Sequence, residues 1–264
     1  MNKWRLAFVP LLCAMLWACA GGGVTPTAES VPRPGPVSSV PRPGSGAQSQ
    51  RPIHIVILGS STACGKNLNV AKYGGQSGGL AGTWPNRYAD YLAKTRPGSK
   101  ITNLCKPGYA TYQAMPSGTH NPRGTSPPDP SRNITAALAR KPDAVILAYP
   151  RIPVSANPKQ IIANIDAIRA AAGSIPVWVQ TPQPTWSMGA GELSARLKFR
   201  QMLLDHYGKF VLDFWTPLAG GDGRSMHPRL GLGDGGHPNK AGHQALFEAV
   251  VSAGIPERVF RAGN

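Results

Sequence analysis

The chain has 264 residues, enough for one sizeable domain with an extension. It carries 28 Lys and Arg residues against 12 Asp and Glu residues, a formal net charge of +16, and most of this excess lies after residue 50. Such a charge favours anionic surroundings such as acidic polysaccharide, lipid headgroups or nucleic acid. The basic residues are scattered, without a nucleic-acid-binding motif, so nucleic acid is not the expected partner.

Residues 1–18 have the pattern of an export signal, in which a basic start precedes the apolar stretch Leu6–Trp17. This stretch is too short for a typical membrane span. The sequence Leu16-Trp17-Ala18-Cys19 resembles the lipobox of bacterial lipoproteins, whose cysteine becomes a lipid-modified N-terminus. We therefore expect Cys19 to carry acyl chains that anchor the protein in the envelope, with Ala20 favouring an outer membrane. The alternative is an ordinary cleaved signal with a chance cysteine.

Residues 19–52 are expected to hold the lipidated cysteine and a tether. They consist mainly of Gly, Pro, Ser, Thr and Val and include two near-copies of Val-Pro-Arg-Pro-Gly. Such a composition cannot bury a core and predicts an extended, disordered linker. Its roughly 30 residues would span about 100 Å when fully stretched. We expect the folded domain to occupy residues 53–264.

Short apolar runs rich in Val and Ile alternate with longer amphipathic runs from residue 53 onward. The apolar runs predict strands at 53–59, 101–105, 144–149, 175–180 and 210–214. The amphipathic runs predict helices at 83–95, 131–140, 158–172, 190–207 and 240–253. Asn157 and Asn239 are typical helix starts, and Gly173 and Gly208 are typical helix ends. The alternation favours the α/β class, as a three-layer α/β/α sandwich around a parallel five-stranded sheet.

Candidate site residues follow several of these strands. The turn Gly59-Ser60-Ser61-Thr62 follows the first strand, Gly108 the second and Arg151 the third. The Gly-rich loop Asp234-Gly235-Gly236-His237 precedes the last helix. In parallel sheets the ligand site lies beyond the carboxyl ends of the strands. We therefore expect these segments to meet at one edge of the sheet.

Ser61, His237 and Asp234 offer the three roles of a nucleophilic serine site. A serine nucleophile needs a base to take its proton, and the base needs an acceptor that fixes its tautomer. The alternative for Ser61 is a structural role in a turn. We expect His243 to pack in the last helix without a catalytic role. The chain has no Gly-x-Ser-x-Gly elbow, which disfavours the α/β-hydrolase fold.

Cys64 and Cys105 are the two cysteines of the expected domain. Each follows the carboxyl end of a predicted strand, and in a parallel sheet these ends can lie close enough for a disulfide in an oxidising compartment. The alternative is a pair of buried free thiols. Neither cysteine has a metal-ligand spacing, so no metal site is expected.

Residues 53–254 resemble the SGNH, or GDSL-type, hydrolases, a superfamily of α/β/α esterases. The first block of the family, usually Gly-Asp-Ser, is similar to Gly59-Ser60-Ser61. The second block is similar to Asn103–Gly108, and the fifth to Asp234–Pro238. These three blocks span most of the expected domain. The resemblance implies the flavodoxin-like fold of that family and a reaction without a metal or organic cofactor.

The resemblance also implies a role for each site residue. Ser61 would be the nucleophile, His237 the base, and Asp234 the carboxylate that orients the base. The backbone N–H groups of Ser61 and Gly108 would form two donors of the oxyanion hole.

The third block departs from the family pattern. The family usually has Asn after the third strand, and its side-chain amide completes the oxyanion hole, but here this position falls on Ile152. Losing one oxyanion donor typically costs about 100- to 1,000-fold in turnover. Arg151 is one candidate substitute, and the alternative is that it is a solvated basic residue. Asn103, Asn121 and Gln113 are further candidates.

Together these features predict a serine esterase of the bacterial envelope that forms an acyl-enzyme. O-acyl groups, such as acetyl, on polysaccharide are the first expected substrate, because of the export signal, the tether and the basic surface. Lipid esters and thioesters are alternatives. The rival functions are a non-catalytic glycan-binding lipoprotein with a degenerate oxyanion hole and an O-acyltransferase with the same triad. We expect a monomer that faces the periplasm or the cell surface, with the membrane as a partner through its lipid anchor.

Overall fold

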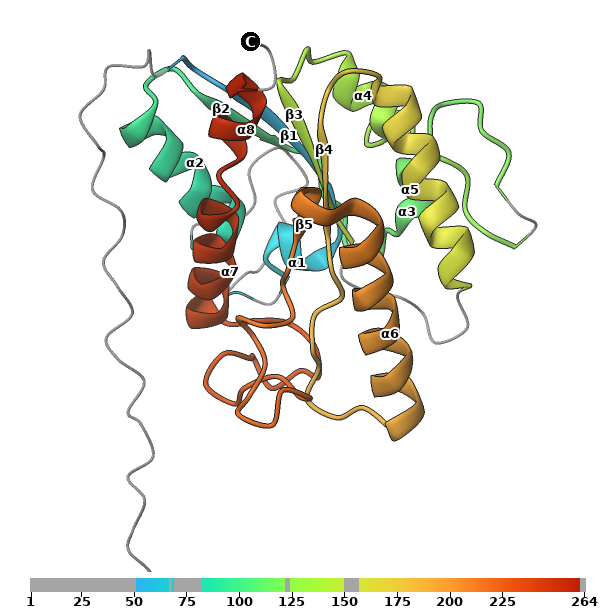
Figure 1. Ribbon diagram of the computed structural model, residues 1–264, viewed down its shortest axis with the longest axis vertical. Helices are drawn as coiled ribbons and strands as arrows, with labels where there is room; N and C mark the ends of the chain where they lie inside the picture. The colour runs from blue at the N-terminus through green and yellow to red at the C-terminus, as the bar shows by residue number, and fades with distance from the viewer. Residues whose placement is uncertain (1–50, 67, 69–81, 122–123, 150–156, 262–264) are drawn as a thin grey trace, which may run out of the picture. The chain divides into compact units, whose positions relative to one another are not determined.

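The computed structural model describes residues 51–66, 68, 82–121, 124–149 and 157–261 (Figure 1). The predicted export signal, Cys19, the tether up to residue 50 and the segment with Arg151 and Ile152 lie outside these residues. In the part of the chain that is described, no helix is long and apolar enough to cross a membrane.

Five parallel strands form one sheet with the order β2-β1-β3-β4-β5. The strands are β1 (His54–Gly59), β2 (Lys100–Asn103), β3 (Ala144–Ala148), β4 (Val177–Gln180) and β5 (Val211–Leu212). This confirms the predicted five-stranded parallel sheet. Each strand is shorter than its predicted run, and β2 begins one residue earlier than expected.

The apolar strands are buried because helices cover both faces of the sheet. Ile55 and Ile57 of β1 belong to one core cluster, while Val56 and Leu58 belong to the other. This alternation follows from the period of two along a strand. All residues of β3 are buried, which explains why its sequence is a continuous apolar run.

The helices form the two outer layers of the predicted three-layer sandwich (Figure 1). One face of the sheet is covered by α2 (Trp84–Thr95), α7 (Lys240–Ser252) and α8 (Ile255–Arg261). The other face is covered by α4 (Ile134–Leu138), α5 (Pro158–Ala172) and α6 (Ala190–Tyr207), with α3 (Thr111–Ala114) beside them. The short elements α1 (Ser61–Cys64), α3, α8 and the 3-10 turn η1 (Gly208–Phe210) were not predicted. Helix α4 is shorter than the predicted run 131–140.

The predicted helix ends are confirmed by their hydrogen bonds and backbone angles. The side chain of Asn157 accepts a hydrogen bond from Lys159 N at 3.0 Å, and the side chain of Asn239 accepts two from the first turn of α7. Gly173 and Gly208 end α5 and α6 with positive φ angles of 61° and 50°. Local polar residues and glycines therefore fix where these helices begin and end.

Gly59 ends β1 where the chain packs too closely for a side chain. A Cβ atom at this position would lie 2.7 Å from Ala63 Cβ and 3.2 Å from Ala148 O. The Gly59 carbonyl accepts a hydrogen bond from Lys106 N at 2.9 Å, and Ser60 N donates to Ala148 O at 3.0 Å. The end of β1 is thus hydrogen-bonded to both neighbouring segments, and α1 starts directly against the sheet.

We predict that Gly59→Ala lowers the free energy of unfolding by about 1–3 kcal/mol, because the added methyl group forces Ala63 and the backbone apart. Urea denaturation of both proteins measures this difference. Gly191→Ala is the control, because Gly191 lies in α6 with open space around it and alanine favours helices. A loss at Gly59 no larger than at Gly191 would contradict the packing argument.

Candidate active site

Ser61 is the first residue of α1, at the carboxyl end of β1. Ser60 keeps an extended backbone with φ −107°, and Gly65 ends the helix in the left-handed region with φ 72°. The first N–H groups of a helix have no acceptor within the helix. The Ser61 N–H is therefore available as a hydrogen-bond donor beside its own hydroxyl group.

Ser61, His237 and Asp234 are joined by hydrogen bonds, although 176 residues separate Ser61 from His237. His237 Nε2 lies 2.9 Å from Ser61 Oγ, and His237 Nδ1 lies 2.8 Å from Asp234 Oδ2. Because a carboxylate only accepts hydrogen bonds, the Nδ1 atom carries the ring proton. Nε2 is then left to accept the serine hydroxyl, so the arrangement can transfer a proton from Ser61 to His237.

The loop that carries His237 is ordered by the second oxygen of Asp234. Asp234 Oδ1 accepts hydrogen bonds from Gly236 N at 3.2 Å and from His237 N at 3.0 Å. Gly235, which follows Asp234, has a φ angle of 93°, a backbone conformation that suits glycine. The side chains of His237 and Asp234 are 19% and 25% exposed. The site is therefore open to solvent although its loop is fixed.

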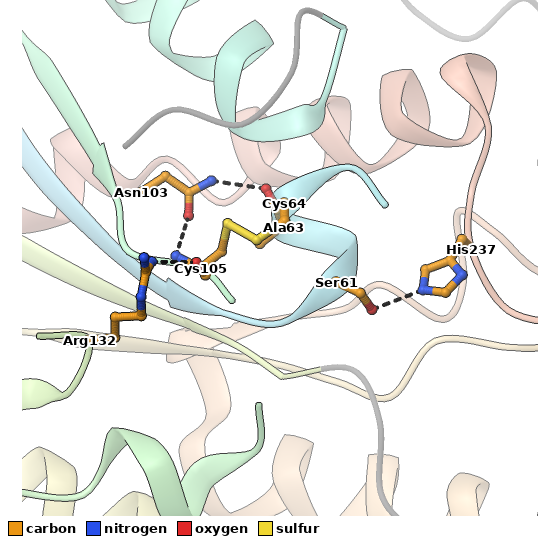
Figure 2. The surroundings of a disulfide bond; sticks show 7 residues. All are labelled: Ser61, Ala63, Cys64, Asn103, Cys105, Arg132 and His237. Carbon is orange, nitrogen blue, oxygen red and sulfur yellow. Dashed lines mark hydrogen bonds between the residues drawn. A yellow bond between two sulfur atoms is a disulfide. The ribbon is translucent and has the colours of Figure 1, made fainter. Parts of the chain in front are cut away.

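The loop after β2 lies against α1. Buried Asn103 donates from Nδ2 to Ala63 O at 2.9 Å and accepts from Cys105 N at 3.1 Å (Figure 2). Further along the loop, Gly108 has a φ angle of 85° and open space where a Cβ atom would lie. Its N–H donates to no backbone acceptor in the part of the chain that the structure describes.

A disulfide joins this loop to the helix that begins at Ser61. Cys64 and Cys105 are bonded, with 5.6 Å between their Cα atoms, so the predicted bridge is present (Figure 2). Both cysteines are buried, and the Cys105 carbonyl accepts a hydrogen bond from Arg132 Nη1 at 2.7 Å. The bridge is therefore part of the packed structure around α1.

The proposed substitutes for the missing oxyanion donor are placed as follows. Asn103 Nδ2 and Asn121 Nδ2 both donate to backbone carbonyls. Gln113 Oε1 accepts the Ala110 N–H in front of α3. The two asparagine amides are thus committed to shaping their loops. Arg151 lies outside the described residues.

Sequence reasoning missed a buried side chain that connects the two halves of this site. Gln183, which is 4% exposed, follows β4. Its Oε1 accepts a hydrogen bond from Thr62 Oγ1 at 3.2 Å, and its Nε2 donates to Gly236 O at 2.5 Å. The available signal was its position just after the fourth strand, at the same edge of the sheet as Ser61.

His243 packs in α7 without contact to the serine, as expected from the sequence. It is 1% exposed, and its Nδ1 accepts the Trp84 N–H at 3.2 Å. Burial lowers its pKa to about 3, and the positive charge of Arg87 acts in the same direction. His243 is thus a neutral hydrogen-bond acceptor that joins α7 to α2. No group of three His, Cys, Asp or Glu side chains suited to a metal occurs among the described residues.

No protein-family model and no curated protein matches the sequence. Solved structures do resemble the fold. A catalytic mutant of an acetylxylan esterase from Geobacillus stearothermophilus is 12% identical, with 77% of this chain and 94% of that chain covered and a TM-score of 0.55. A GDSL-like lipase from Bacteroides thetaiotaomicron is 12% identical, with 80% and 89% covered and a TM-score of 0.52. A member of the lipolytic protein G-D-S-L family from Veillonella parvula is 15% identical, with 75% and 96% covered and a TM-score of 0.50. These likenesses establish a shared fold.

We predict that the lowered pKa of His243 makes the protein sensitive to mild acid. Below about pH 6.5 the unfolded chain binds a proton at this histidine that the folded protein does not, so the free energy of unfolding falls until about pH 3. Urea denaturation at several pH values should show a shallower fall in His243→Gln than in the wild type. His120→Gln, at an exposed histidine, should keep the wild-type slope. If the free energy of unfolding falls equally with pH in all three proteins, the lowered pKa of His243 is refuted.

We predict that replacing both disulfide cysteines, Cys64→Ser with Cys105→Ser, lowers the free energy of unfolding by about 2–4 kcal/mol. The bridge joins residues 41 apart, so its loss frees a long loop in the unfolded chain. Urea denaturation measures the change. Reductant should destabilise the wild type and leave the double variant unaffected. The prediction fails if full reduction, verified by mass, does not change wild-type stability.

Proposed function

We propose that this chain, which has the fold of the SGNH hydrolases, is a serine esterase that cleaves ester bonds through a covalent acyl-enzyme. The observation that carries the proposal is a pair of hydrogen bonds: His237 Nδ1 donates to Asp234 Oδ2 at 2.8 Å, and the Ser61 hydroxyl donates to His237 Nε2 at 2.9 Å. The same three roles are required for a nucleophilic serine. The position at the carboxyl edge of a parallel sheet supports it further.

In the proposed mechanism Ser61 Oγ attacks the ester carbonyl carbon while His237 Nε2 takes the hydroxyl proton. Asp234 stabilises the imidazolium ion and keeps its orientation. His237 then gives the proton to the leaving alkoxide, which leaves the acyl group on Ser61. In the second half a water molecule gives its proton to His237 and attacks the acyl carbon. The bond between this carbon and Ser61 Oγ then breaks, the acid leaves, and His237 returns the proton to Ser61 Oγ.

The backbone N–H groups of Ser61 and Gly108 are the proposed oxyanion donors. The first position of α1 and the open surroundings of Gly108 support this assignment. Arg151 is the proposed third donor in place of the usual asparagine. With two backbone donors alone, turnover would be about 100- to 1,000-fold below that of a complete oxyanion hole.

O-acyl groups on polysaccharide, such as acetyl esters, are the proposed substrates. One protein with this fold is an acetylxylan esterase, which supports this class for the present chain. A polymer needs an accessible nucleophile, and Ser61 is partly exposed, as are the side chains of His237 and Asp234 beside it. Other proteins with the fold are lipases and lipolytic proteins, so lipid esters are the alternative class.

The proposed location is the bacterial envelope, with the lipidated Cys19 as the anchor and the domain as a monomer. The distribution of charge supports attachment to an anionic surface. Exposed basic side chains gather near the edge where the strands begin, opposite Ser61: Arg51, Lys94, Lys100, Arg140, Lys141, Lys209, Arg258 and Arg261. Among the described residues, Asp143, Asp166, Asp205 and Glu257 are acidic residues near this edge, so basic side chains outnumber acidic ones there. Lipid headgroups of a bacterial membrane carry the complementary charge.

We predict that Ser61→Ala lowers the turnover of short-chain aryl esters by at least about 1,000-fold, because it removes the nucleophile. Release of the aryl alcohol by the purified protein measures the rate. A serine-directed phosphonate should label the wild type at Ser61 and leave the variant unlabelled. Ser60→Ala is the matched control, because this adjacent serine makes no side-chain capping bond, and it should keep wild-type turnover.

The Ser61→Ala experiment also distinguishes the proposed esterase from the rival functions. A wild type with no Ser61-dependent turnover and no phosphonate label would refute the esterase. If such a protein bound an acylated glycan, it would be the non-catalytic lipoprotein that the substitution at Ile152 suggests. Turnover with transfer to an added sugar hydroxyl would instead indicate an acyltransferase.

A further inference from the structure

The buried contacts of Gln183 close a ring around the candidate active site. From Ser61 the ring runs through the hydrogen bond to His237, along the chain to Gly236, and through the Gln183 amide to Thr62. Thr62 is the neighbour of Ser61 in α1 and is 1% exposed. The ring therefore joins the helix of the serine to the loop of the histidine by a second path, which lies beneath the exposed triad.

The contact with Gly236 acts on the peptide group that carries His237. The carbonyl of Gly236 and the N–H of His237 belong to one planar peptide unit. Gln183 Nε2 donates to this carbonyl at 2.5 Å, while Asp234 Oδ1 accepts from the N–H at 3.0 Å. The two hydrogen bonds hold the opposite sides of the same plane and so fix the direction in which the His237 side chain leaves the backbone.

The orientation of the Gln183 amide follows from its partners. A backbone carbonyl only accepts, so the NH₂ group of Gln183 must face Gly236. The amide oxygen then faces Thr62, whose hydroxyl rotates to donate. Both hydrogen bonds are thus made in one amide orientation, at a site where an unpaired buried amide would be unfavourable.

A residue of α6 holds the backbone of Gln183 by a further hydrogen bond. Arg196, 6% exposed, donates from Nη1 to the Gln183 carbonyl at 3.2 Å. Glu192 accepts from the same guanidinium at 2.6 and 3.0 Å, which fixes its direction. The bridging side chain therefore extends from a supported position.

We propose that Gln183 is a positioning residue, which holds His237 in line with Ser61 by fixing the Gly236–His237 peptide against α1. The inference rests on the proposed esterase function. A small misplacement of a catalytic group can cost about 100-fold in rate, even when the substrate still binds. Loss of the bridge should therefore lower kcat and leave KM nearly unchanged.

Three variants in the purified protein test the bridge. Gln183→Met keeps the length of the side chain and removes both hydrogen bonds. Gln183→Glu keeps the shape and places an oxygen against the Gly236 carbonyl. Gln180→Met is the matched control, because Gln180 is 3% exposed at the end of β4 and its buried amide atoms have no hydrogen-bond partner among the described residues. We expect kcat to fall about 10- to 100-fold in both Gln183 variants, with KM within about threefold, and to stay within about twofold in Gln180→Met.

A second measurement does not depend on turnover. Nuclear magnetic resonance of protein with ¹⁵N-labelled histidine reports the ring nitrogens of His237 and their hydrogen bonds. The His237 signals should move in Gln183→Met and remain at their wild-type positions in Gln180→Met. The signals of His243 should remain in place in both variants, since this residue is held by Trp84.

The outcomes distinguish a positioning role of Gln183 from a role in stability alone. A lower melting temperature with unchanged kcat and unchanged His237 signals would overturn the proposal, as would an equal fall in kcat for Gln180→Met. If the wild type shows no Ser61-dependent turnover, the esterase function fails. The histidine signals then still decide whether Gln183 positions His237.

Discussion

The position of Ser61 depends on the backbone hydrogen bonds at the end of β1. This strand lies between β2 and β3, and its end is hydrogen-bonded to the segment after β2 and to the last residue of β3. Leu104 N donates to Ile57 O at 2.8 Å, just before the two bonds that hold Gly59 and Ser60. Because all strands run in parallel, the segments after β2 and β4 reach the same edge as this turn. The other parts of the site are supported from that edge.

Buried polar side chains around α1 have hydrogen-bond partners, whereas several buried polar groups elsewhere in the domain do not. Around α1 the amides of Asn103 and Gln183 and the hydroxyl of Thr62 all have partners. On the face of the sheet covered by α2, α7 and α8, by contrast, several buried groups have none among the described residues: Trp84 Nε1, Tyr88 OH, Trp178 Nε1, Trp186 Nε1 and the Gln180 amide. An unpaired buried group costs about 1–3 kcal/mol. The pairing of the three side chains around α1 therefore orders the surroundings of Ser61 more strictly than those of the unpaired groups.

The sequence was sufficient for the sheet, the long helices and the residues that form the hydrogen-bonded chain. Strands and helices have different periods, and Asn157 and Asn239 mark helix starts through local bonds. Ser61 and His237 could be paired because a parallel sheet brings strand ends together. The helices α1 and α3 have four residues each, which is too short for a periodic signal.

The parts of the site that could not be predicted from the sequence depend on tertiary contacts. Gln183 meets Thr62 across 121 residues of sequence. Its position just after the fourth strand places it at the edge of the sheet that carries Ser61, but its two partners follow only from the folded chain. The proposed role of Arg151 stays a prediction from the sequence, since it lies outside the described residues.

The direction of the strands also bears on the role of the basic surface, which we linked from the sequence to a polysaccharide substrate. The chain enters β1 at His54 and reaches Ser61 after six strand residues, which span about 20 Å. The described chain therefore begins, at Arg51, on the side of the sheet away from the candidate active site. The exposed basic side chains near Arg51 lie on this same side. Under the proposed function, these charges lie too far from Ser61 to contact the reacting ester. Specificity would then depend on the loops around Ser61 and His237, at the opposite edge of the sheet.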